Sequence, residues 1–307
     1  TMCCLFDPAP QIFPFDPVAL KTDRDSVFGY GQWRVADWAS LHGGLEYVRL
    51  QDPNNGDRAE RVNGKLGAVF RLASGTTLRS AVFQGVKGAK YDQEGLEPTQ
   101  FAGFNQVFDD FDGTRWKRVA AAVDQAFRGG IKAGLELSGR KLEVPGMGCL
   151  ETACLGRWDE TLHRAYVAIP FGTRAALSGE WRHEASHLEG DPGQFNSNPY
   201  RMRTDLLPVR LWFKAGVGDA FLEQWGVRQN ARITELTGAD TAGHSAFWVT
   251  NLRYSVPLVS TRLVGSLSVS NLFDRDFRFQ NTDLNGDPKA PLFYPRRTVL
   301  LQGSIRF

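Results

Sequence analysis

The sequence has no apolar run that approaches the roughly 18 residues needed for a helix to cross a bilayer. Its mean hydropathy of −0.31 is that of an ordinary water-soluble protein, although 42% of its 307 residues are hydrophobic. These values exclude a helical membrane protein. They leave room for a transmembrane β-barrel, because barrel strands place every second residue on a polar interior and a hydropathy scan detects little of them.

Motifs for catalysis are also scarce. The chain has no glycine-rich phosphate loop, no nucleophile elbow and no Cys/His metal quartet. The net charge is only +2, and the basic residues are spread along the chain instead of forming a nucleic-acid patch. We therefore expect no catalytic residue, no metal, no cofactor and no nucleic-acid partner.

Cysteine is rare, with four residues in two close pairs. Cys149 and Cys154 lie in a stretch flanked by glycine and proline, which favours a loop disulfide in an oxidising compartment over metal binding, because no second ligand pair is near. Cys3 and Cys4 have no assignable role. A charged-then-apolar leader is not visible at Thr1, so we expect that a leader was removed or that the chain begins inside a longer protein.

Glycine, phenylalanine and tryptophan are plentiful, at 32, 21 and 8 residues, and this favours β-structure with aromatic girdles. In the last stretch, Val299, Leu301, Gly303, Ile305 and Phe307 alternate with polar residues. An oily face that ends at a terminal aromatic residue is typical of the last strand of an outer-membrane barrel.

Alternation between turn signals predicts thirteen strands. They lie near 26–37, 41–51, 62–73, 77–88, 118–128, 131–143, 157–170, 174–185, 205–216, 220–232, 246–257, 261–274 and 296–307. Connections alternate between short turns and long loops, the long ones covering roughly 52–61, 89–117, 144–156, 186–204, 233–245 and 275–295. Bacterial barrels have short periplasmic turns, long extracellular loops and even strand numbers. We predict an all-β, antiparallel transmembrane β-barrel of about 14 strands over residues 26–307. Residues 1–25 are a lead-in that holds the fourteenth strand or the remnant of an upstream region.

One segment resembles a known family. The string Asn271-Leu272-Phe273-Asp274, followed by a long loop and Tyr294-Pro295-Arg296-Arg297, is similar to the C-terminal end of TonB-dependent-receptor-like barrels over about the last 60 residues. That family implies 22 strands, a plug domain and an energy-coupling box, and neither plug nor box is visible here. The strand number is closer to the barrels that follow helical repeats in polysaccharide-export porins.

Along each predicted strand, alternate residues face opposite sides of the sheet. When the more apolar set is assigned to the lipid, the other set forms a basic inner face. The predicted lumen-lining residues are Lys65, Arg71, Arg79, Arg118, Arg128, Lys132, Arg140, Arg174, Arg182, Arg210, Lys214, Arg228, Arg253, Arg262 and Arg306. Opposing acids on this face are Glu46, Asp124, Glu136, Glu180 and Glu184. Such a wall favours anions in a pore. Alternatively, the arginines pair with these acids or with an inserted loop and form a filled polar core.

The loop 89–117 is a candidate gate. Phe101, Phe104, Phe108 and Phe111 recur at helical spacing after Pro98-Thr99, which predicts a short helix capped by Thr99. The acids Asp109, Asp110 and Asp112 could approach the basic wall if the loop folds inward. Outward folding would make a binding surface, and self-packing of the aromatic residues is a third alternative.

The string His183-Glu184-Ala185-Ser186-His187 matches the zinc-peptidase pattern H-E-x-x-H. That chemistry needs a helix, because four residues of strand separate the two histidines by about 13 Å. The surrounding alternation favours a strand, so a zinc metallopeptidase is the most remote hypothesis.

We conclude from the sequence that the protein is a non-enzymatic channel or export pore of the bacterial outer membrane that passes anionic solute or polymer. The alternative is a plugged receptor or scaffold barrel that binds a ligand or partner through its extracellular loops. The expected contacts are outer-membrane lipid, the barrel-assembly machinery through Phe307 and a periplasmic or inner-membrane partner. The C-terminus is expected in the periplasm.

Overall fold

The computed structural model describes residues 23–52, 57–72, 75–87, 97–106, 110, 113–145, 155–189, 200–234, 240–259, 263–277 and 296–305. These residues are almost entirely β-structure. In chain order the elements are β1 (Asp23–Ala36), β2 (Ala39–Asp52), β3 (Asp57–Arg71), β4 (Thr76–Val86), β5 (Gln100–Phe101), β6 (Phe104–Asn105), β7 (Arg115–Ala126), the 3-10 turn η2 (Arg128–Gly130), β8 (Lys132–Pro145), β9 (Leu155–Phe171), β10 (Ala175–Glu189), β11 (Tyr200–Ala215), β12 (Gly218–Thr234), β13 (Asp240–Val259), β14 (Leu263–Ser270) and β15 (Thr298–Ile305). Within this described part, no helix is long and apolar enough to span a membrane.

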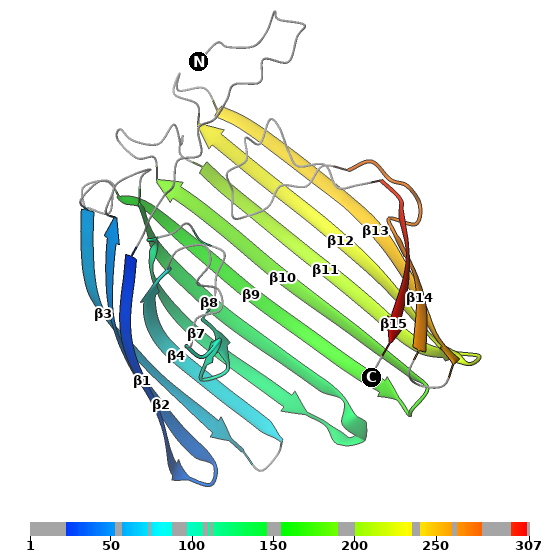
Figure 1. Ribbon diagram of the computed structural model, residues 1–307, viewed down its shortest axis with the longest axis horizontal. Helices are drawn as coiled ribbons and strands as arrows, with labels where there is room; N and C mark the ends of the chain where they lie inside the picture. The colour runs from blue at the N-terminus through cyan, green and yellow to red at the C-terminus, as the bar shows by residue number, and fades with distance from the viewer. Residues whose placement is uncertain are drawn as a thin grey trace, which may run out of the picture.

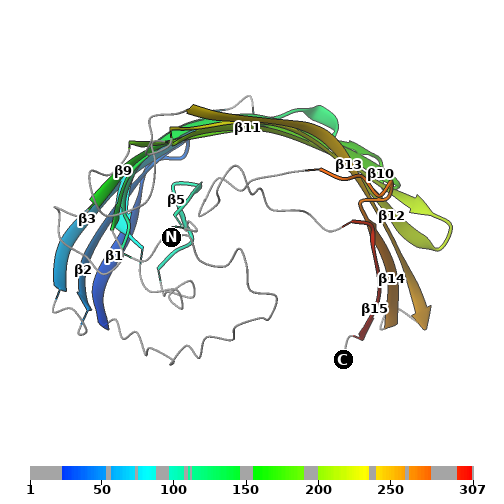
Figure 2. The ribbon, with the colours of Figure 1, turned by 90° about the horizontal axis from the view of Figure 1, so that it is seen from above.

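Thirteen of the described strands form one antiparallel sheet in chain order, with β4 pairing directly with β7, while β5 and β6 form a separate two-stranded sheet. The sheet curls strongly around an interior, with β1 and β15 at its two edges (Figure 2). The predicted antiparallel all-β fold and its thirteen strands are confirmed. The sheet begins at Asp23, and residues 1–22, where a fourteenth strand was expected, lie outside the described residues.

The turns gather at one edge of the sheet and the longer connections start and end at the other (Figure 1). Gly75, Gly172 and Gly216 lie in the turns at the first of these edges. Each has a positive φ, a backbone conformation that is costly for a residue with a side chain. At the opposite edge, two of the loops expected to be long are short. Strands β2 and β3 extend until only 53–56 join them, and 235–239 join β12 to β13. Period-2 patterns weaken near strand ends, so the sequence underestimates these strands.

The two faces of the sheet have opposite chemistry. Large apolar side chains on the convex face are exposed, as suits lipid contact, among them Val119, Leu137, Val167, Leu207, Leu252 and Leu301. The concave face carries buried polar groups such as Glu46, Lys65 and Arg118, together with a cluster of buried aromatic side chains. The alternation of side chains along each strand produces this separation.

The Asn-Leu-Phe-Asp string after β14 connects three strands by hydrogen bonds. Asn271 is buried with a φ of 50°, and its backbone N–H donates to Asn251 Oδ1 on β13 at 3.0 Å. Its side-chain oxygen accepts from the backbone of Arg275, and Asp274 accepts from the backbone of Arg297 at 2.9 Å. The motif therefore fixes the exit of β14 against β13 and the entry to β15.

Candidate functional site

A β-hairpin formed by β5 and β6 lies inside the curve of the sheet (Figure 2). Its two-residue turn has Ala102 and Gly103 at φ values of 49° and 83°, the conformation that matches the twist of a tight hairpin. The helix predicted after Thr99 is therefore wrong for this stretch. The aromatic spacing that predicted it places Phe101 and Phe104 opposite each other across the hairpin.

The hairpin is packed firmly on the inner wall. Phe101 and Phe104 are only 4% and 0% exposed. The Phe101 ring lies 5.8 Å from that of Phe83 on β4, between ring centroids, and Gly67 on β3 leaves the space that Ala102 occupies. A Cβ at Gly67 would lie 2.6 Å from that of Ala102. The wall and the hairpin are thus complementary in shape.

Acids of the same connection pair with bases of the wall. Glu97 accepts hydrogen bonds from Lys65 Nζ at 3.0 Å and from the Tyr30 hydroxyl at 2.5 Å, and it lies 3.6 Å from Arg24. Burial alone would raise the pKa of Glu97, but the hydrogen bonds from Tyr30 and Lys65 and the charge of Lys65 outweigh it and lower the pKa. Glu97 is therefore held as a carboxylate on the wall.

A second anchor lies further along the connection. Asp110 forms a bidentate ion pair with Arg140 on β8, with nitrogen–oxygen distances of 2.9 and 3.0 Å. Arg140 also donates to Glu160 on β9. Bidentate pairs between arginine and carboxylate fix geometry as well as charge, so this contact sets where the connection lies on the wall.

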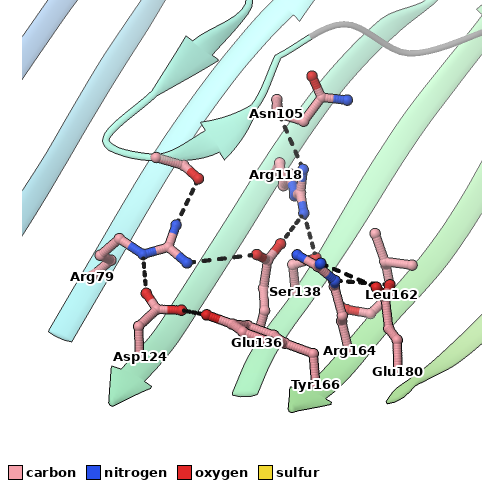
Figure 3. Close-up of polar contacts among 11 residues, drawn as sticks. Arg79, Asn105, Arg118, Asp124, Glu136, Ser138, Leu162, Arg164, Tyr166 and Glu180 are labelled. Carbon is pink, nitrogen blue, oxygen red and sulfur yellow. Dashed lines mark hydrogen bonds and ion pairs between the residues drawn. The ribbon is translucent and has the colours of Figure 1, made fainter. Parts of the chain in front are cut away.

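Between the two anchors, Arg79 and Arg118 of the wall each bind several partners (Figure 3). Arg79 binds Asp124 at 2.8 Å and the carbonyl oxygen of Gly103 at 2.6 Å. Arg118 is 2% exposed and donates to Glu136, to Ser138 and to the Asn105 carbonyl oxygen. Two arginines predicted to face a pore thus hold the backbone of the inserted hairpin.

The wall on the other side, from β9 to β12, is more open. Glu180 receives both Arg164 and Arg182, whose side chains are 41% and 37% exposed. On β11, Arg210 pairs with Glu223 and is 31% exposed. The arginines keep part of their surface accessible here, whereas the hairpin covers those on β4 and β7.

The strand register places most of the predicted basic residues on the inner face. These are Lys65, Arg71, Arg79, Arg118, Lys132, Arg140, Arg182, Arg210, Lys214 and Arg253. Arg128 lies in the turn η2 and Arg174 in the turn before β10, so neither lies on the wall. Arg228 pairs across strands with Asp205 on the outer face, which corrects its assignment, because both parities of β12 carry polar residues. Arg262 and Arg306 lie outside the described residues.

Of the predicted gating residues, Phe101, Phe104 and Asp110 meet the inner wall as described above. Phe108, Asp109, Phe111 and Asp112 lie outside the described residues, as do Cys149, Cys154 and Phe307.

Sequence reasoning missed two acids that neutralise the wall, Glu160 and Glu223. Glu160 could not be assigned to the inner face from the sequence, because apolar and polar residues do not alternate regularly along the strand at 157–170. Register recovers it, since Arg140 and Glu160 are directly opposite on β8 and β9.

The zinc-peptidase string lies in the middle of β10. His183 pairs across strands with His163 and Asp205, and its Nδ1 lies 2.9 Å from Asp205 Oδ1. Because the string is extended, His183 and His187 are separated along the strand, and the helical zinc site is not formed.

The fold is that of known outer-membrane barrels. No protein-family model and no curated protein matches the chain. Among solved structures, it is similar to the ferripyoverdine receptor of the outer membrane of Pseudomonas aeruginosa bound to ferripyoverdine, at 11% identity and a TM-score of 0.61, over 92% of this chain and 38% of that one. The FpvAI–pyocin S2 complex matches at 10% identity and a TM-score of 0.61, over 93% of this chain and 40% of that one. The copper transporter OprC matches at 15% identity and a TM-score of 0.58, over 93% of this chain and 50% of that one.

The chain therefore has a β-barrel fold that resembles the barrels of TonB-dependent receptors. It spans half the length of these structures or less. The likeness lies in the fold, since fewer than one residue in six is identical.

Proposed function

We propose that the protein is a receptor-type transport barrel whose passage is closed from within by the connection between β4 and β7. This is the alternative interpretation of the sequence rather than the open anion channel. The observation that carries it is the buried hairpin, with Phe104 fully inaccessible and ion pairs from Glu97 and Asp110 on either side.

On the wall from β9 to β12, where the other described residues cover the arginines less, an anionic ligand would bind. Arg164, Arg182 and Arg210 are partly exposed there and face two glutamates, which leaves a positive excess among these five groups. The similar structures are a receptor bound to ferripyoverdine, a complex with pyocin S2 and a copper transporter. For this chain we propose the chemical class alone: a negatively charged solute, which binds at the loop side and is admitted when the hairpin moves.

Single-channel conductance in a planar bilayer tests the closure. We expect the wild-type protein to be nearly silent and Gly67→Leu to conduct, because a leucine at this site overlaps Ala102 and Phe101 and expels the hairpin. Gly64→Leu is the matched control: it lies on the same strand, but on the outer face with no atom within 4 Å of its Cβ position. Steady wild-type conductance equal to that of Gly67→Leu would refute the closed barrel and restore the open-channel interpretation.

A further inference from the structure

The outer face of β10 to β12 changes from apolar to charged or polar residues along the strands. Towards the turns, the outward residues are apolar, as in Leu207, Val209 and Leu211 on β11. Beyond Leu207 they become Asp205, Arg203 and Arg201. The neighbouring strands change at the same level, since His183, Asp205 and Arg228 are directly opposite one another. This border marks the height at which hydrocarbon gives way to headgroups.

Two tryptophans lie at this border and support its position. Trp181 and Trp248 are 38% and 46% exposed on the outer face, one row below the charged residues. The Trp181 indole nitrogen donates to Asp205 Oδ1 at 3.3 Å while its ring faces outward. Tryptophan prefers the membrane interface because its ring is apolar and its N–H needs a polar partner.

Between the two tryptophans lies a groove of about 370 Å³. Its floor includes Leu207 and Gly226, and Arg228 and Asp205 lie at its upper end. Gly226 is required here, since the Trp248 ring lies 2.7 Å from the position of a Cβ. Open to the lipid side and mainly apolar, the groove has the shape and chemistry for an acyl chain.

Above the groove the surface is strongly basic. Arg201, Arg203, Arg228 and Arg232 project from the same face of two adjacent strands, with Arg201 and Arg232 directly opposite each other. Asp205 is the described acidic residue on this face of β11 and β12. Arginine binds phosphate bidentately, and rows of arginine side by side suit a headgroup with more than one phosphate.

We propose that this surface, the groove with its four arginines, binds one phosphorylated, multiply acylated lipid of the outer leaflet. The phosphates lie among Arg201, Arg203, Arg228 and Arg232, and one acyl chain lies between Trp181 and Trp248. The outer leaflet is the site because the arginines lie at the edge of the sheet opposite the short turns, which we expect to be periplasmic (Figure 1). The proposal does not depend on whether the hairpin closes the passage.

Native mass spectrometry of the full chain tests the site, with diphosphoryl lipid A added to protein purified in detergent. We expect one bound lipid A, and about tenfold or more weaker retention in Arg203→Gln/Arg228→Gln, since charge-assisted hydrogen bonds to phosphate are lost. The control is Arg49→Gln/Arg157→Gln, which removes two charges from the outer faces of β2 and β9, away from the groove. A shift in electrophoretic mobility on heating verifies that each variant is folded.

Four results would overturn the proposal. The first is no retained lipid A, and the second is equal loss in both double variants, which would reduce the effect to total charge. The third is equal retention of phosphatidylglycerol, which would mean general anion attraction. A protein dimer in place of a lipid adduct would assign the same face to a second copy and also count against it.

Discussion

Removing the aromatic anchor of the hairpin should open the passage. Phe104 is fully buried, and the guanidinium carbon of Arg79 lies 4.8 Å from the centre of its ring. Replacing a buried phenylalanine with alanine costs about 3–5 kcal/mol. In the proposed gate the open arrangement exposes this ring, so Phe104→Ala should shift the equilibrium towards the open arrangement by nearly that amount. At 1.4 kcal/mol per factor of ten, a loss of about 4 kcal/mol is a shift of several hundredfold.

The assay is single-channel conductance, with entry of a small hydrophilic antibiotic into intact cells as the second readout. Phe104→Ala should conduct for a measurable fraction of the time where the wild-type protein is closed. Phe127→Ala is the control, because Phe127 lies beside the turn η2 and is 53% exposed. If Phe104→Ala folds, becomes less stable and remains silent, the hairpin is part of the structural core of the barrel and is not its gate.

Two further predictions concern pH and the lipid face. The folded-state pKa of Glu97 is lowered, so its ion pair with Lys65 contributes fully above the ordinary glutamate pKa of about 4.3 and is lost as the pH falls through the lowered value. Wild-type conductance should therefore rise on acidification below about pH 4, and Glu97→Gln should show less of this dependence; a flat profile in the wild-type protein would contradict the anchor. On β15, Leu301 faces lipid and is 80% exposed, whereas Leu300 faces inward. Leu301→Arg should destabilise the folded barrel in liposomes by about 2–4 kcal/mol and Leu300→Arg by much less, as measured by urea unfolding; equal losses would mean that the two faces are assigned wrongly.

The sequence by itself determined most of the strands and most of their faces. The alternation of apolar and polar residues in β15, from Val299 to Ile305, can be recognised without knowing which strands lie beside it. The turn at Gly172 likewise depends on a few adjacent residues. Period-2 patterning and turn chemistry are short-range, so thirteen strands and their antiparallel order could be predicted. The same reasoning gave the inner placement of Arg79, Arg118 and Arg140.

Only the tertiary structure decided what the inner wall does. Arg140 could be placed on the wall from its parity, but its partners Asp110 and Glu160 come from a connection and from a strand with no clear pattern. Phe101 and Phe104 have the spacing of a helix, yet they form a hairpin, because the pocket beside Gly67 and Phe83 accepts a tight turn. The arginines on β11 and β12 become one surface only when register aligns Arg201 with Arg232. Charge pairing and packing depend on which residues meet across the sheet, and that information lies in long-range contacts that a single sequence does not display.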